Sequence, residues 1–325
     1  MNNLELKNEI LRLKKDKGAV ILGHYYQIDE IQELSDYVGD SLALAQEAQR
    51  TDAPIIVFCG VHFMAETAKI LNPTRKVLLP ELEASCSLAE SCKGEDLRRF
   101  KAEHPDHIVV SYVNCSAEVK AESDLICTSG NAEKLINALP NDQKIIFAPD
   151  KNLGGYINTK TGRNMLLWNG VCTVHDALES ESILNLKKEN PDAPVIAHPE
   201  CNGAVLAVSD FVGSTKAMLN YIKSSHSKRF IVATEAGILF EMKRENPDKE
   251  FITVPGGNCK FPQTEEGSCC SCAECSYMKM NTLEKLYRCL RDETPEITMS
   301  SDMIEKAAKP IVRMLEMSRE LGIIK

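Results

Sequence analysis

The chain has 325 residues, of which 43% are hydrophobic, which is enough for two or three domains with proper cores. Its net charge of −9 argues against a nucleic-acid-binding protein, because such a protein needs a basic face. The polar N-terminus lacks a signal-peptide pattern and no apolar run approaches the roughly 18 residues of a membrane span, so we expect a cytoplasmic protein. In that reducing compartment thirteen cysteines indicate metal ligation for some of them, with others serving as small buried side chains.

Three segments of the chain share one order of features. Each opens with an apolar run that ends in polar residues: "GAVILGHYYQ", "HIVVSYVNCS" and "APVIAHPECN". A helical pattern opened by Ser or Thr and a second apolar run follow in each. A repeat of roughly ninety residues is too long for a solenoid unit and suits a small α/β domain. We predict three related α/β/α domains with small parallel sheets around a pseudo-threefold axis, with an active site at the centre.

The repeats set the predicted domain boundaries. The first domain is 1–100 with an N-terminal helix, the second is 101–190, and the third is 191–325 with a cysteine-rich insertion. The last thirty residues carry apolar side chains near helical spacing, which favours a helix packed on the core over a partner-binding helix.

Polar side chains follow the first strand of each predicted repeat. They are His24, Tyr26, Tyr112, Asn114, His198 and Glu200. Because ligand-binding groups gather at the carboxyl ends of parallel strands, we expect these side chains to share one cavity. Imidazole, carboxylate and phenol groups together suit proton transfer and the binding of polar substrate groups. For any single one of them, a structural role is the alternative.

Ser41, Ser129 and Thr215 open the helical patterns, each fifteen to seventeen positions after a polar strand end. Helix N-termini attract carboxylate and phosphate, so the three openings predict an anion site, with plain N-capping as the alternative. The sequence has neither a phosphate-binding loop nor a dinucleotide fingerprint, so we expect no nucleotide cofactor.

One cysteine per repeat follows the last strand. Cys86 and Cys172 stand in the turn-like stretches "EASCSL" and "NGVCTV". The third repeat offers either Cys259 at the aligned place or Cys275 at the end of "CCSCAEC". Three converging thiolates suit a 4Fe–4S cluster with one open iron, and zinc held by three cysteines and water is the alternative metal.

Eight stretches stand in order between Gly23 and Tyr287: "GHYYQ", "GDSLALA", "ASCSLAE", "YVNCSAEVKAESDLICTSGNA", "WNGVCTVHD", "HPEC", "VGSTKAM" and "CSYMKMNTLEKLY". In these stretches, which cover nearly the whole chain, the sequence resembles the quinolinate synthase family. The resemblance implies a condensing enzyme (a transferase) of NAD biosynthesis. It would join iminoaspartate (iminosuccinate) to dihydroxyacetone phosphate and release phosphate and water to give quinolinate.

The resemblance also implies that one cysteine from each domain holds a single 4Fe–4S cluster: Cys86, Cys172 and Cys275. Cys275 is preferred to Cys259 because it matches the family's C-x-x-M motif together with Met278. Some family members have two further cysteines that look like a redox pair, here Cys269 and Cys272. The other cysteines are expected to pack in the core or lie at the surface: Cys59, Cys92, Cys115, Cys127, Cys201, Cys270 and Cys289.

By the same resemblance, the substrates are held by His24, Ser41, Tyr112, Asn114, Ser129, His198, Glu200 and Thr215. Glu200 is the expected general base and Tyr26 the proton shuttle, with His198 beside them, and the cluster is expected to act as a Lewis acid without electron transfer. Expected partners are the two small substrates and, functionally, an aspartate oxidase that supplies iminoaspartate, with no nucleic acid and no membrane. An aconitase-like hydro-lyase and an iron–sulfur sensor are the alternative functions.

Overall fold

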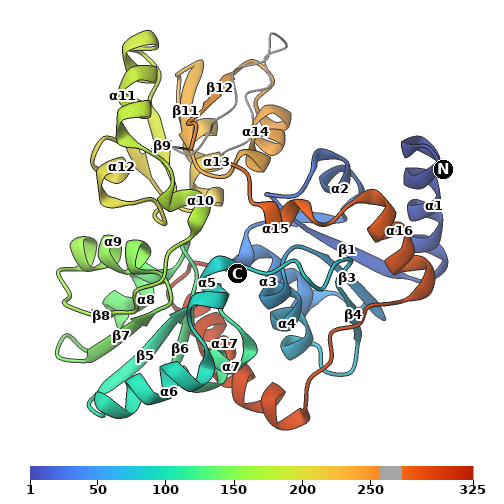
Figure 1. The fold of residues 1–325 in the computed structure, drawn as a ribbon, viewed down its shortest axis with the longest axis horizontal. Helices are drawn as coiled ribbons and strands as arrows, with labels where there is room; N and C mark the ends of the chain where they lie inside the picture. Colours follow the sequence, from blue (N-terminus) through green and yellow to red (C-terminus); the bar gives the residue numbers. More distant parts are fainter. Residues whose placement is uncertain (257–272, 325) are drawn as a thin grey trace.

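The computed structural model describes residues 1–256 and 273–324, and its ribbon forms three lobes around a common centre (Figure 1). Each lobe contains one parallel sheet of four strands. Counted from its own first strand, every sheet has the spatial order second, first, third, fourth. The predicted fold class, α/β with three related domains built on small parallel sheets, is therefore confirmed.

The first sheet lies in the N-terminal part of the chain. Its strands in spatial order are β2 (Tyr37–Gly39), β1 (Ala19–His24), β3 (Ile55–Cys59) and β4 (Lys76–Leu78). The helices of this segment are α1 (Asn3–Asp16), α2 (Asp29–Leu34), α3 (Ser41–Arg50), α4 (His62–Leu71) and α5 (Ser87–Ser91). Strands β1 and β3 are buried almost throughout, as expected of a sheet covered on both faces.

The second sheet follows the same plan. Its strands in spatial order are β6 (Leu125–Cys127), β5 (His107–Tyr112), β7 (Lys144–Ala148) and β8 (Leu166–Leu167). Its helices are α6 (Gly94–Glu103), α7 (Ala117–Glu122), α8 (Ala132–Ala138), α9 (Lys151–Thr161) and α10 (Thr173–Asp176).

The third sheet repeats the plan once more. Its strands in spatial order are β10 (Phe211–Val212), β9 (Val195–Ala197), β11 (Arg229–Ala233) and β12 (Glu250–Thr253). Its helices are α11 (Ser180–Glu189), α12 (Gly203–Ala207), α13 (Thr215–Ser224), the 3-10 helix η1 (Ala236–Ile238), α14 (Leu239–Glu245) and α15 (Ser276–Lys279).

An aspartate at one equivalent place in each lobe shows that the three lobes are structural repeats. Asp36, Asp124 and Asp210 each accept, through a carboxylate oxygen, the N–H of the residue fifteen positions earlier, at 2.7–2.8 Å. Each aspartate also donates its own N–H to the carbonyl of that same residue at 2.9 Å. The pairing satisfies backbone groups at the start of the sheet's first strand and holds the second strand beside it.

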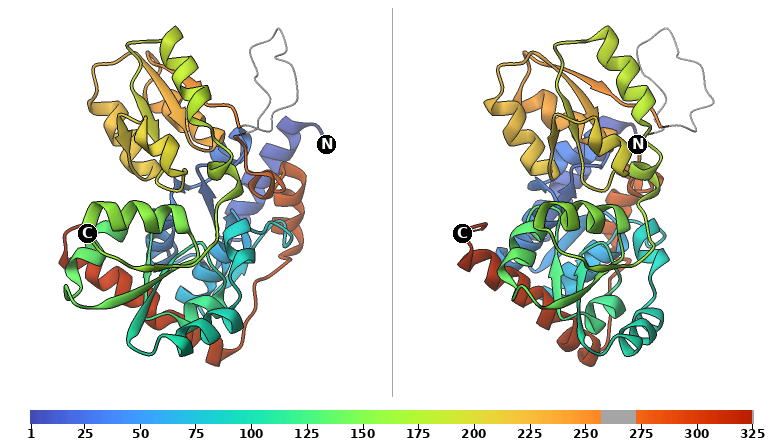
Figure 2. Two further views of the ribbon diagram at one scale, coloured as in Figure 1. Left: turned by 60° about the vertical axis from the view of Figure 1, so that its left-hand side comes forward. Right: turned by 90° about the vertical axis from the view of Figure 1, so that its left-hand side faces the viewer.

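The last two helices leave the third lobe. Helix α16 (Leu283–Asp292) packs against α1 and β3 of the first lobe, and α17 (Ser301–Glu320) packs against α7 and β6 of the second (Figure 2). Ala307, Ile311 and Met314 are buried on the inner face of α17, so this helix covers the second lobe. The boundaries 1–100, 101–190 and 191–325 stay a prediction. In the described part of the chain, every helix is too short or too polar to cross a bilayer.

Candidate active site

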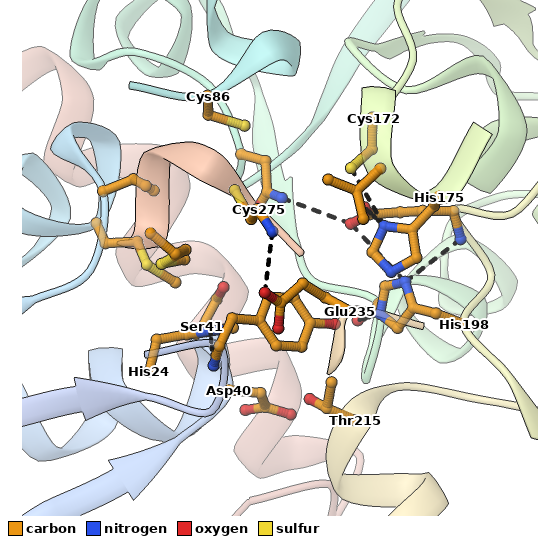
Figure 3. Close-up of a pocket in the computed structure, with 18 of the residues that line it drawn as sticks. His24, Asp40, Ser41, Cys86, Cys172, His175, His198, Thr215, Glu235 and Cys275 are labelled. Atoms are coloured by element: carbon orange, nitrogen blue, oxygen red, sulfur yellow. Dashed lines mark hydrogen bonds and ion pairs between the residues drawn. The ribbon is translucent and has the colours of Figure 1, made fainter. Parts of the chain in front are cut away.

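A pocket at the meeting point of the three lobes brings together all twelve predicted site residues (Figure 3). They are His24, Tyr26, Ser41, Cys86, Tyr112, Asn114, Ser129, Cys172, His198, Glu200, Thr215 and Cys275. These positions lie at the carboxyl ends of strands or at the starts of helices that follow them, where open α/β sheets place their ligand sites. Their convergence is a structural fact, whereas the role of each stays a prediction.

The three pocket cysteines occupy equivalent places. Cys86, Cys172 and Cys275 are the N-cap residues of the short helices α5, α10 and α15, each of which follows the last strand of its lobe. All three are partly exposed, whereas the other described cysteines are buried. Burial raises the pKa of Cys86 to about 12 and that of Cys275 to about 11, and N–H groups in the first turn of each helix act in the opposite direction.

A buried carboxylate fixes the backbone of Cys275. The Cys275 N–H donates to Glu235 at 2.9 Å, and the second oxygen of Glu235 accepts the Gly237 N–H at 2.7 Å. Lys279 pairs with Glu235 at 3.2 Å and donates to the carbonyl oxygen of Tyr26 at 2.7 Å. The Glu235 side chain is only 1% exposed, and its ion pair with Lys279 joins helix α15 to the segment after β11. The hydrogen bond from Lys279 to Tyr26 joins the same helix to the loop that carries Tyr26.

The other predictions on the cysteine-rich stretch fall outside the described residues. These concern Cys259 as the rival ligand, Cys269 and Cys272 as a redox pair, and Cys270 as a packing or surface thiol. The remaining cysteines expected to pack are all buried: Cys59, Cys92, Cys115, Cys127, Cys201 and Cys289.

Two histidines at strand ends share one hydrogen-bonding pattern. The Nδ1 of His24 accepts the N–H of Tyr26 at 3.1 Å, and the Nδ1 of His198 accepts the N–H of Glu200 at 3.4 Å. In a neutral ring this pairing leaves the proton on Nε2. Burial lowers the pKa of each ring to about 3. Both side chains are therefore uncharged Nε2–H donors. The Nε2 atom of His198 lies 3.2 Å from the Ser129 hydroxyl oxygen.

Glu200 is the most heavily contacted acid of the pocket. One carboxylate oxygen accepts the Tyr112 hydroxyl at 2.5 Å and lies 3.5 Å from the Asn114 amide, while the other is 2.9 Å from Nδ1 of His175. Burial alone would raise the pKa of Glu200, but the imidazoles of His175 and His198 and the tyrosine hydroxyl hold it below its usual range. The group is a buried, ionised carboxylate that can accept a proton.

Sequence reasoning missed His175, Thr234 and Glu235. Thr234 is fully buried at the end of β11, and its hydroxyl lies 3.0 Å from the Tyr26 hydroxyl and 2.9 Å from Nε2 of His175. His175 stands one helical turn after Cys172 in "CTVHD", a spacing that places both side chains on the same face of a helix. That spacing was the available signal.

The cysteine, histidine and acidic side chains also show where a metal fits. Among the described residues, one group of three such side chains is close enough to hold a single ion: Cys172, His175 and Glu200. Their ligand atoms all lie within 4.8 Å of one another. Cys86, Cys172 and Cys275 do not form such a group. Three thiols around a wider space suit a polynuclear cluster, whose irons are spread over several positions.

Two of the three residues predicted to open helices do so, whereas Ser129 lies before the N-cap residue Asn131 of α8. Ser41 is the first residue of α3 and Thr215 the first of α13, and both line the pocket. The cap side chains Asp40 and Ser214 accept the N–H groups of Ala43 and Ala217 in the first turns of these helices.

The chain is similar to known proteins over almost its whole length. The family model described as "Quinolinate synthetase A protein" matches residues 8–316. A quinolinate synthase of Microcystis aeruginosa is 56% identical over 314 residues, covering 97% of this chain and 95% of the relative. A quinolinate synthase of Chloroherpeton thalassium is 56% identical over 319 residues, covering 98% and 96%, and one of Thermosynechococcus vestitus is 55% identical over 315 residues, covering 97% and 96%.

Proposed function

The chain belongs to the quinolinate synthase family, and from this premise we propose that its central pocket condenses iminoaspartate with dihydroxyacetone phosphate. The products are quinolinate, phosphate and water, in a step of NAD biosynthesis. One observation carries the proposal. Three cysteines capping equivalent helices, one from each lobe, face the same pocket as the polar strand ends.

Cys86, Cys172 and Cys275 would hold a 4Fe–4S cluster in this pocket. The fit rests on three partly exposed thiols that stand too far apart to form a single-ion group in the described structure. A cluster held by these three thiolates would supply one open iron with Lewis-acid character. The condensation needs no net electron transfer.

The pocket has separate groups for the substrate anions. The neutral Nε2–H groups of His24 and His198 donate hydrogen bonds without adding charge. Ser41, Ser129 and Thr215 add hydroxyls, and Ser41 and Thr215 stand at the N-terminal ends of α3 and α13. Carboxylates and a phosphate are bound well by such donors at helix N-termini. We assign the two carboxylates of iminoaspartate and the phosphate of its partner to this set.

Glu200 and Tyr26 are the proposed proton carriers. Glu200 is ionised and buried, and it accepts a proton from a carbon beside a carbonyl or imine group. Tyr112 and His175 hold this carboxylate in place through hydrogen bonds. Tyr26, whose hydroxyl is held by Thr234, passes protons at the sugar-derived carbons.

The test is an assay of protein purified without oxygen. Iminoaspartate and dihydroxyacetone phosphate are added together, and both quinolinate and released phosphate are measured. We expect the two products in equal amounts. Failure to form quinolinate, or dehydration of a hydroxy-acid without phosphate release, would contradict the proposal. The supply of iminoaspartate by an aspartate oxidase and a cytoplasmic location stay predictions.

A further inference from the structure

One corner of the pocket has the donor set of a mononuclear metal site. The Nδ1 of His175 lies 3.2 Å from the sulfur of Cys172 and 2.9 Å from a carboxylate oxygen of Glu200. The ligand atoms of the three side chains all lie within 4.8 Å of one another. Thiolate, imidazole and carboxylate together form a ligand set that zinc favours, with a fourth position left for water.

The surroundings of His175 prepare its ring for metal binding. The Nε2 atom lies 2.9 Å from the hydroxyl of Thr234. Without a metal, Nδ1–H donates to the Glu200 carboxylate and Nε2 accepts the Thr234 hydroxyl. With a metal on Nδ1 the ring would take the other tautomer, and the Thr234 hydroxyl would accept the Nε2–H. The ring also stacks on the ring of His198, with centroids 4.8 Å apart. Both contacts fix the orientation of the imidazole before any ion arrives.

Burial and charge favour a divalent cation at this corner. The side chains of His175 and Glu200 are 2% and 4% exposed. A thiolate and a carboxylate bring two negative charges, and a divalent ion neutralises both within a poorly hydrated space. A metal bond to each donor would replace hydrogen bonds that the cluster-free side chains make with one another.

We propose that the cluster-free chain binds one zinc ion at Cys172, His175 and Glu200, and that this ion excludes the iron–sulfur cluster. The exclusion follows because zinc would take the Cys172 thiolate that the cluster needs as one of its three protein ligands. The ion would also occupy the proposed general base. This inference rests on the proposed function in one respect, namely that Cys172 is also a ligand of the cluster. Zinc binding itself depends on the three side chains.

Zinc binding is measured on cluster-free protein prepared without oxygen and treated with a chelator, with Co²⁺ as the optical probe and Zn²⁺ as its competitor. His175→Ala should weaken binding of one Zn²⁺ equivalent by more than the ~10–100-fold that loss of an outer-shell partner costs, because one of the three protein ligands is gone. Cys86→Ala and Cys275→Ala should bind that equivalent as the wild type does. Any ion held elsewhere on the chain would be unaffected by His175→Ala. The test is therefore the difference in zinc affinity between the wild type and each variant.

Cluster reconstitution separates this proposal from the previous one. His175→Ala should still take up iron and sulfide, whereas Cys86→Ala and Cys275→Ala should not. Zinc added before iron should block reconstitution of the wild type and leave that of His175→Ala unaffected. Unchanged zinc affinity in a folded His175→Ala, or equal loss in Cys86→Ala, would overturn the zinc site. Loss of the cluster from His175→Ala would show that His175 is needed for cluster binding, and it would contradict our assignment of this residue to the zinc site alone. Circular dichroism of each variant establishes that it is folded.

Discussion

The described residues contain cysteines in two kinds of surroundings. Six are buried among sheets and helices: Cys59, Cys92, Cys115, Cys127, Cys201 and Cys289. Three are partly exposed, open a short helix after the last strand of a lobe and face the central pocket: Cys86, Cys172 and Cys275. Burial raises the thiol pKa in both groups, so acidity does not separate them. The two groups of cysteines differ instead in their position at a helix start and in their access to the pocket.

The largest expected effect comes from removing a pocket cysteine. Cys275→Ala would leave the cluster with two protein thiolates, so we expect protein purified without oxygen to lack a stable cluster and to be inactive. Iron and sulfide analysis measures the first outcome, and quinolinate formation the second. Cys259→Ala, Cys269→Ala and Cys272→Ala should keep their iron. Full iron content in Cys275→Ala together with loss in Cys259→Ala would reverse the assignment of the third ligand.

The second effect separates the proposed chemistry from cluster binding. Glu200→Gln keeps the size of the side chain but cannot accept a proton, so quinolinate formation should fall by ~10²–10⁴-fold while iron content stays normal. Glu241→Gln is the matched control, because Glu241 is also buried but lies outside the pocket lining. Wild-type turnover in Glu200→Gln would remove this residue from the proton-transfer step.

Histidines of the pocket and of the surface differ in burial: His24 is buried, whereas His226 is exposed. Burial lowers the pKa of His24 to about 3, so the unfolded chain binds one more proton than the folded chain as pH falls from 6.5 toward 3. Stability should therefore drop on acidification, by up to about 1.4 kcal/mol per pH unit from this residue. His24→Gln should reduce that slope in urea unfolding between pH 7 and pH 5. His226→Gln, at an exposed position, is the control and should keep the wild-type slope.

The smallest effect belongs to a core cysteine. Cys127 ends strand β6 and is fully buried, so Cys127→Ala removes packing contacts without touching the pocket. We expect a loss of about 1 kcal/mol in the free energy of unfolding, the usual size for a small cavity-forming change. Cluster content and activity should equal those of the wild type. Loss of iron from this variant would show that core packing, rather than the position of a thiol at a helix start, decides which cysteines hold the cluster.

The sequence predicted much of the fold because its repeats carry local signals. Apolar runs ending in polar residues predicted the first strands and placed His24, Tyr112 and His198 at one edge of each sheet. The sites of Cys86 and Cys172 followed from the same repeat. Residue types and spacing are enough for such inferences, since parallel strands align their carboxyl ends.

The missed residues depend on contacts between distant segments. Thr234 and Glu235 follow the apolar strand β11, and their roles come from hydrogen bonds to residues distant in the sequence: Tyr26, His175 and Cys275. The course of the C-terminal helices over the first two lobes was equally hidden. Their apolar faces predict burial, but nothing in a single sequence states which surface they cover.

The most direct test of the account is iron spectroscopy of anaerobic protein before and after substrate is added. A 4Fe–4S cluster held by three cysteines has one iron without a protein thiolate, so Mössbauer spectra should show one iron site that changes when dihydroxyacetone phosphate and iminoaspartate bind. We expect that change in the wild type and in Cys127→Ala, and no cluster spectrum in Cys275→Ala. A colourless protein with bound zinc and no iron after anaerobic purification, yet full quinolinate formation, would contradict it.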